Sequence, residues 1–160
     1  MGGSLLSFEV ASVVPATADA VWERITTFEG VNHELMPIVR MTCPPALRRI
    51  DPATVPLGQP WFRSWIMLFG LVPIDYDHLR IVSIETGRGF HEDSTMLSQR
   101  RWVHRRDLEA VAGGTRVRDR IEFEPRLPFL GPLLRVVFQA VFRHRHRRLG
   151  VYFRRGARRV

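Results

Sequence analysis

The chain has 160 residues, 45% of them hydrophobic, a formal net charge of +8 and a single cysteine, Cys43. This length and composition are typical of one folded domain over residues 1–160 and argue against wholesale disorder. One cysteine excludes an intrachain disulfide and a cysteine-based zinc site within the chain, which fits a reducing compartment, so we expect a cytoplasmic protein.

The first half of the chain predicts one strand and two short helices. Residues 5–14 alternate in polarity and read as a strand that Pro15 ends. Thr17 is a suitable N-cap for a helix that we expect to continue through Phe28 until Gly30 breaks it. A second helix is expected over 31–36.

The middle of the chain predicts a meander of strands joined by short turns. Residues 44–60 are rich in proline and read as a loop with room for one short strand around 46–50. The remaining strands are expected over 38–43, 61–69, 75–86 and 90–98.

The last third of the chain predicts a long hairpin followed by a long helix. The strands cover 99–111 and 114–125, and the helix begins near Gly131 and Pro132 and ends near Arg154. One side of this helix is apolar and contains Val137, Phe138, Val141, Phe142, Leu149 and Tyr152. Strands joined by short turns pair antiparallel, and helices at the chain ends indicate an α+β fold with the sheet curled around the last helix.

The inner face of the hairpin carries polar groups among apolar ones. On its first strand this face holds Trp102, His104 and Arg106, and on its second strand it holds Asp119. The outer face is expected to be solvent-exposed and holds Arg101, Val103, Arg105, Asp107 and Glu109.

The register of the hairpin depends on its turn. A two-residue turn at Ala112–Gly113 pairs Arg106 with Asp119 and His104 with Ile121, whereas a turn one residue later pairs Leu108 with Asp119. Unpaired burial of such polar groups would cost several kcal/mol each. They therefore either form an internal Arg106–Asp119 pair, with His104 bonded to the backbone, or meet a ligand.

Arg145 falls inside the apolar stripe of the last helix. One interpretation lets its stem lie on apolar surface while the guanidinium reaches solvent. The other makes it a cation at one end of a cavity, where it meets a carboxylate, a phosphate or a polarised carbonyl.

The adjacent residues His33 and Glu34 lack the second histidine of a zincin motif and are interpreted as a surface pair at a helix end.

The sequence resembles the SRPBCC superfamily, also called START/Bet v 1-like. The resemblance covers most of the chain and rests on residues 14–22, 90–93, 102–108, 113–123 and 145–149. It implies a helix-grip fold, in which a curved antiparallel sheet wraps a long C-terminal helix and leaves a cavity between them. Cavities of this kind hold a largely apolar ligand that a few polar groups orient.

The main hypothesis is therefore a protein that binds or transports a hydrophobic small molecule, such as a lipid, a quinone or a polyketide-like compound. No metal or cofactor is predicted. The candidate ligand-binding residues are Trp102, Val117, Ile121, Phe138 and Val141 for the apolar body, and His104, Arg106, Asp119 and Arg145 for the head group.

Two other classes of function are kept as alternatives. In a cyclase or dehydratase that acts on a polyketide-type substrate, His104 would be the general base and Arg106 or Arg145 would stabilise an enolate. In an interaction protein, the basic run 144–148 would contact an acidic membrane or ribosomal surface. A basic tail without a recognition motif is weak evidence for nucleic-acid binding, so we do not predict nucleic acid as a partner.

Overall fold

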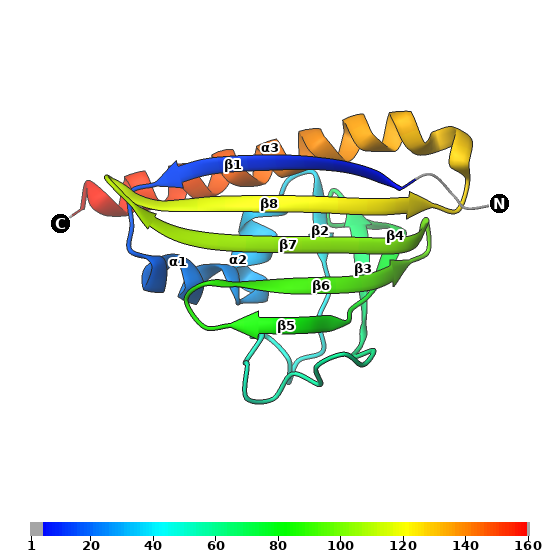
Figure 1. The fold of residues 1–160 in the computed structure, drawn as a ribbon, viewed down its shortest axis with the longest axis horizontal. Helices are drawn as coiled ribbons and strands as arrows, with labels where there is room; N and C mark the ends of the chain where they lie inside the picture. Colours follow the sequence, from blue (N-terminus) through cyan, green and yellow to red (C-terminus); the bar gives the residue numbers. More distant parts are fainter. Residues whose placement is uncertain (1–4, 160) are drawn as a thin grey trace.

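The computed structural model describes residues 5–159 and places one antiparallel sheet against the C-terminal helix α3 (Figure 1). This arrangement confirms the predicted α+β helix-grip fold. None of the helices within residues 5–159 is long and apolar enough to cross a membrane. The elements are β1 (Leu6–Val14), α1 (Ala18–Ile25), α2 (Phe28–Leu35), β2 (Val39–Met41), β3 (Arg63–Leu68), β4 (Val72–His78), β5 (Ile81–Glu85), β6 (Gly89–Met96), β7 (Gln99–Val111), β8 (Gly114–Pro125), the 3-10 turn η1 (Pro128–Leu130) and α3 (Gly131–Ala157).

The sheet turns a corner at β6. Its strand order is β1-β8-β7-β6-β4-β3-β2, and β5 pairs with the same edge of β6 that β4 uses further along. The predicted strand 75–86 is therefore wrong, because the chain bends between β4 and β5. Arg80 holds this bend, since its backbone N donates to Ser94 Oγ (3.0 Å) and its Nε to the Asp93 carbonyl (2.6 Å). Beyond the corner, β2, β3 and β4 run across the back of the molecule (Figure 1).

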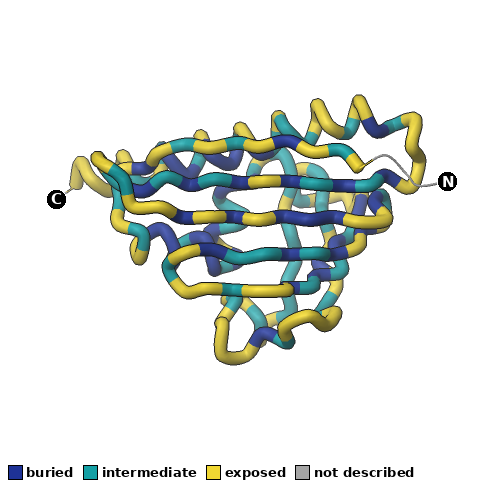
Figure 2. Tube along the Cα trace, viewed as in Figure 1, coloured by how far each residue is buried: buried dark blue, intermediate teal, exposed yellow. Residues whose placement is uncertain are grey.

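The long hairpin has the register that the two-residue turn predicts. Arg106 pairs with Asp119 and His104 with Ile121, and Gly113 has the positive φ that this turn requires. The inner face is buried as expected (Figure 2). Val103 contradicts the predicted solvent-exposed outer face, because it is buried between its cross-strand neighbours Asp93 and Glu122. The expected short strand around 46–50 is absent, and Arg49 forms only an isolated bridge with Thr27.

Two apolar clusters hold α3 and the short helices on the sheet. One joins α1 to the C-terminal half of α3 and contains Val14, Val21, Trp22, Ile25, Leu108, Val117 and Leu149. The other lies under the N-terminal half of α3 and contains Phe8, Met96, Trp102, Ile121, Phe123 and Phe142. Because α3 packs over β1 and β8, the β4–β6 side of the sheet is left for other contacts.

The break between the two short helices is not where the sequence predicts it. Helix α1 ends at Ile25, and the Thr27 side chain caps α2 by accepting a hydrogen bond from Gly30 N (3.0 Å). Gly30 therefore lies inside α2 rather than ending α1. A Cβ at this position would lie 1.9 Å from the Arg24 carbonyl oxygen, so glycine is required by the close approach of the two helices.

We expect Gly30→Ala to destabilise the protein by about 1–3 kcal/mol, because α1 and α2 must separate to admit the methyl group. Urea unfolding followed by circular dichroism measures the change. Gly156→Ala is the matched control, since a Cβ at this helical position meets no neighbour and should raise stability by up to about 1 kcal/mol. Equal stability of the two variants would contradict the tight packing.

Candidate functional site

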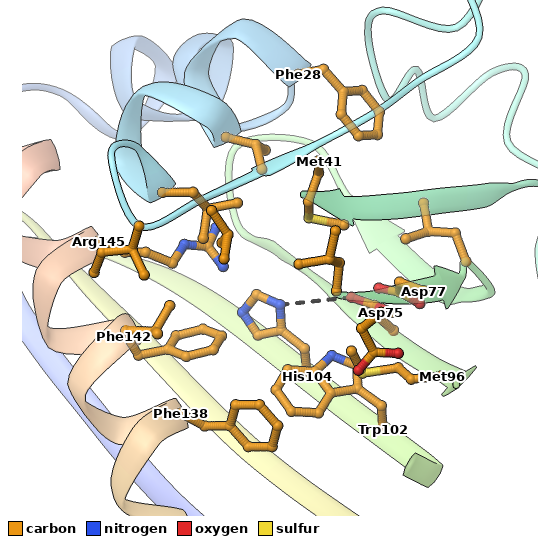
Figure 3. Close-up of a pocket in the computed structure, with 18 of the residues that line it drawn as sticks. Phe28, Met41, Asp75, Asp77, Met96, Trp102, His104, Phe138, Phe142 and Arg145 are labelled. Carbon is orange, nitrogen blue, oxygen red and sulfur yellow. Dashed lines mark ion pairs between the residues drawn. The ribbon is translucent and has the colours of Figure 1, made fainter. Parts of the chain in front are cut away.

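A cavity of about 270 Å³ lies between α3, α2 and the strands β3, β4, β6 and β7 (Figure 3). Apolar side chains form most of its wall. Phe28 and Leu35 of α2 face it from one side, and Met41, Ile66 and Met96 close it from the strands. The cavity lies beneath α3 and extends from it over the β4–β6 part of the sheet.

The structure brings five of the nine predicted site residues to this cavity. Trp102, His104, Phe138, Val141 and Arg145 line it. The Trp102 and Phe138 rings meet edge to face at 5.1 Å, and the His104 ring meets Phe142 in the same way at the same distance. Aromatic packing therefore fixes the orientation of both Trp102 and His104.

The other four predicted site residues lie outside the cavity. Val117 and Ile121 are fully buried in the two apolar clusters beneath α3. Arg106 and Asp119 are also fully buried and belong to a network of charged groups behind the cavity wall. They reach the cavity only through His104 and Arg145.

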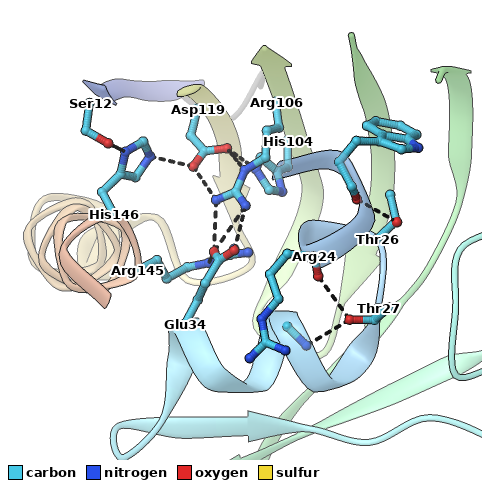
Figure 4. Close-up of polar contacts among 12 residues, drawn as sticks. Ser12, Arg24, Thr26, Thr27, Glu34, His104, Arg106, Asp119, Arg145 and His146 are labelled. Atoms are coloured by element: carbon cyan, nitrogen blue, oxygen red, sulfur yellow. Dashed lines mark hydrogen bonds and ion pairs between the residues drawn. The ribbon is translucent and has the colours of Figure 1, made fainter. Parts of the chain in front are cut away.

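This buried network is built around the Asp119 carboxylate (Figure 4). Its Oδ1 lies 2.7 Å from His104 Nε2 and accepts from Arg106 Nε (2.7 Å). Its Oδ2 accepts from Arg106 Nη2 (2.7 Å) and lies 2.7 Å from His146 Nε2. A carboxylate only accepts, so both histidines direct a protonated Nε2 at Asp119. His104 is therefore bonded to Asp119 rather than to the backbone.

Glu34 completes the network and corrects the prediction of a surface pair. It is fully buried, and its carboxylate accepts from Arg106 Nη1 (3.0 Å) and Arg106 Nη2 (3.1 Å). It also accepts from Arg145 Nε (3.0 Å). The snorkelling interpretation of Arg145 is consequently wrong, because the guanidinium turns inward and is neutralised by Glu34.

Charge pairing sets the protonation of this network. Burial is the largest single effect and would raise the pKa of Glu34 and of Asp119, but the charge and hydrogen bonds of Arg106 together with Arg145 (for Glu34) and His104 (for Asp119) outweigh it. The pKa of Glu34 is therefore lowered, and the pKa of Asp119 lies well below its usual range. Both groups are ionised near neutral pH.

A second polar group lines the cavity at the corner of the sheet, where β4 meets β6. It consists of Asp75, Asp77 and Glu92. Asp75 is satisfied, since Oδ1 accepts from Tyr76 N (2.8 Å) and Ser98 N (3.2 Å), and Oδ2 accepts from the Ser98 hydroxyl. Glu92 accepts from Ser94 Oγ (2.8 Å), and its Oε2 lies 3.7 Å from His104 Nδ1.

Asp77 has a different environment from its two neighbours. It is 4% exposed, and its Oδ1 has no hydrogen-bond partner among the described residues. Burial, followed by the negative charge of Glu92, raises the pKa of Asp77 well above its ordinary value. Burial opposes ionisation of Glu92 as well, yet His104, Asp77 and Ser94 lower the pKa of Glu92. The pKa values of Asp77 and Glu92 are thus driven apart, that of Asp77 upward and that of Glu92 downward.

The mouth of the cavity opens between the β3–β4 hairpin and α3. Ile74 and Val137 line the cavity and are also about half exposed, at 48% and 45%. The surface beside these two residues is apolar, since the β3–β4 hairpin carries the exposed side chains of Phe69, Leu71 and Val72, and the exposed Leu133 lies one helical turn before Val137 on α3. An apolar molecule can therefore approach the interior along an apolar surface.

The model of one protein family, a domain of unknown function (DUF8410), matches residues 12–153. The chain belongs to the DUF8410 family. No curated protein matches the chain.

Solved structures show the wider fold of this DUF8410 domain. A START superfamily protein from Mycobacterium smegmatis matches with a TM-score of 0.63 at 12% identity, over 94% of this chain and 97% of that one. Ara h 8.0201 matches with a TM-score of 0.62 at 13% identity, over 94% and 98%. The di-domain ARO/CYC StfQ from the steffimycin biosynthetic pathway matches with a TM-score of 0.65 at 13% identity, over 96% and 52%. These likenesses confirm the SRPBCC, START/Bet v 1-like fold.

Several buried polar residues around the candidate site were not predicted from the sequence. Glu34, Asp77, Glu92 and His146 were not predicted as site residues, although all four are buried. Charge balance was the available signal for Glu34, because two inward arginines and one aspartate leave a positive charge that a buried carboxylate must offset. No comparable signal marks Asp77 and Glu92, which meet only because the sheet turns between β4 and β5.

We expect Asp77→Asn to stabilise the domain increasingly as pH rises. A carboxyl group whose pKa is raised in the folded protein costs no stability at a pH below its ordinary pKa of 3.8. Above that pH the unfolded chain releases the proton first, so the folded state loses stability relative to it. The asparagine removes this cost, so its advantage should grow by up to about 1.4 kcal/mol per pH unit until the folded pKa is reached. Denaturant unfolding of both proteins between pH 4 and pH 8 measures the difference. A difference that does not change with pH would show that Asp77 ionises normally.

Proposed function

We propose that this protein binds or transports a hydrophobic small molecule, such as a lipid, a quinone or a polyketide-like compound, in the cavity beneath α3. The observation that carries the proposal is the cavity of about 270 Å³ with its largely apolar wall and apolar mouth. Protein interiors are normally packed as densely as organic crystals, so a void of this size forfeits many van der Waals contacts. A bound apolar molecule would restore them.

The predicted site residues divide into contact and support roles in this proposal. Trp102, Phe138 and Val141 would contact the body of the ligand, and His104 and Arg145 would face its polar end. Arg106 and Asp119 would hold those two side chains in place from behind the wall. Val117 and Ile121 would support the floor from the core.

Two measurements test the proposal. The protein is purified without detergent, and native mass spectrometry followed by solvent extraction identifies any compound that is retained. The extracted protein is then titrated with Nile red, an uncharged apolar dye, and saturable one-to-one binding is expected. Absence of a retained compound together with absence of saturable dye binding would contradict the proposal.

The polar corner gives specific support to a second candidate, an enzyme of the cyclase or dehydratase type. Neighbouring carboxyl groups whose pKa values are driven apart can serve as an acid and a base, and Asp77 and Glu92 form such a pair beside His104 in the cavity. The fold shared with the di-domain ARO/CYC StfQ is consistent with this candidate. The test incubates a poly-β-carbonyl thioester with the protein and with His104→Ala. Unchanged turnover in the variant would contradict the role of His104 as general base.

The basic run 144–148 gives less support to an interaction with an acidic membrane or ribosomal surface. Arg145 and His146 belong to the buried network, and Arg148 Nε donates to the His33 carbonyl (3.0 Å). His144 Nε2 lies 3.0 Å from the Met36 carbonyl oxygen. These four residues dock α3 on its neighbours, which leaves Arg147 as the exposed member of the run.

A further inference from the structure

The two polar ends of the cavity differ in what they can offer a ligand. At one end, the cavity is lined by Arg145, whose Nε already donates a hydrogen bond to the buried Glu34 carboxylate (3.0 Å). Its charge is therefore balanced inside the protein. A ligand carboxylate that approached Arg145 would compete with Glu34 and would lie near a second negative charge.

The opposite end, at the β4–β6 corner, is rich in hydrogen-bond acceptors. Asp75, Asp77 and Glu92 all line the cavity there, and each is at least nine-tenths buried. The oxygens of Asp75 accept three hydrogen bonds from protein groups. Glu92 accepts a hydrogen bond from Ser94 and lies within ion-pair distance of His104. Like charges repel strongly in such a buried site, so a negatively charged head group is disfavoured at this end as well.

Asp77 provides an acceptor that no described protein group uses. Asp77 is one of the residues that line the cavity, its Oδ1 has no hydrogen-bond partner among the described residues, and an unsatisfied buried polar group is costly. Burial and the charge of Glu92 raise the pKa of Asp77, which favours the neutral acid, and its carboxyl group can accept a hydrogen bond in either protonation state. Figure 3 shows Asp75 and Asp77 on the strand that faces His104 across the cavity.

We propose that the cavity selects apolar ligands whose head group is a hydroxyl rather than a carboxylate, and that Asp77 accepts the hydrogen bond from that hydroxyl. The proposal rests on the proposed function and specifies the ligand class for the same cavity. It covers aliphatic alcohols, sterols and phenols, which share an apolar body and one hydroxyl donor.

The test compares two ligands with the same chain, 1-decanol and decanoate, by displacement of Nile red at pH 7.5. We expect 1-decanol to compete at concentrations at least about tenfold lower than decanoate, because the acid would bring an unpaired negative charge into the cavity. Asp77→Leu should weaken 1-decanol binding about three- to tenfold, as expected for one hydrogen bond, and calorimetry measures this affinity without the dye. Asp107→Leu, at an exposed position of β7 outside this cavity, is the matched control and should change neither ligand.

Each other outcome identifies which proposal fails. Equal or tighter competition by decanoate would overturn the hydroxyl preference and would identify Arg145 as the anchor, while ligand binding itself would stand. Unchanged 1-decanol affinity in Asp77→Leu would overturn the role of Asp77. Absence of saturable Nile red binding to the unaltered protein, together with no binding of either decyl compound by calorimetry, would overturn the binding function and with it this inference.

Discussion

Replacing Glu34 with glutamine is expected to destabilise the protein by about 3–5 kcal/mol, the usual cost of removing one partner from a buried ion pair. Glu34 is fully buried and accepts hydrogen bonds from both Arg106 and Arg145. Glutamine keeps the shape of the side chain but leaves two buried guanidinium groups with Asp119 as their only carboxylate in this network. Chemical unfolding near neutral pH gives the difference in free energy.

The pH dependence of the Glu34→Gln variant separates charge from packing. The folded pKa of Glu34 is lowered, so its contribution is fully present above its ordinary value of 4.5 and is lost as pH falls through the folded pKa. The difference between the two proteins should therefore shrink in acid. Glu23→Gln removes an exposed ion pair with Arg49 and serves as the control, with stability close to the unaltered protein. If the loss of unfolding free energy in Glu34→Gln stayed the same as the pH was lowered, it would indicate a packing defect instead.

The sheet and its long hairpin were accessible from sequence because their signals are local. A register shift of one residue would turn a buried face outward, so the inner face follows from the sequence, whereas the sequence allows either Arg106 or Leu108 to pair with Asp119 and the structure has the Arg106 pairing. The cap at Thr17 and the start of α3 at Gly131 follow in the same way from local chemistry.

The candidate site was only partly accessible, because its remaining parts depend on contacts between distant segments. Glu34 lies 72 residues before Arg106 in the chain, and its position on a short helix beside a histidine resembles a surface pair. Asp77 and Glu92 are brought together by the bend between β4 and β5. The sequence does not show this bend, because the β-branched residues there favour one continuous strand. Periodicity shows which side of a strand is inward but not which inward residues meet a cavity.

The two polar groups around the cavity have opposite energetic characters. The network of Glu34, Arg106 and Asp119 is closely paired and holds α2, the hairpin and α3 together. At the β4–β6 corner, Asp77 has an unused acceptor and a raised pKa. A satisfied network specifies one arrangement of the fold, whereas a buried group with an unused acceptor is a candidate place for another molecule to bind.

Filling the cavity should abolish ligand binding without unfolding the protein. Val141 of α3 lines the cavity, and in Val141→Trp the indole ring would occupy space that is now hollow. We expect Nile red and 1-decanol affinities to fall by at least about tenfold, and the ligand-induced rise in melting temperature to disappear. Stability without ligand should be retained, because the ring gains contacts instead of displacing packed neighbours.

Val136→Trp is the matched control for this variant. It places the same ring on the same helix at a position that is 64% exposed and outside the cavity wall, so it should leave binding unchanged. Loss of binding in Val141→Trp but not in Val136→Trp, with both proteins folded, would place the ligand in the cavity. Full binding in Val141→Trp would instead assign the dye and the alcohol to the apolar surface around the mouth, and the cavity beneath α3 would then have no part in the function.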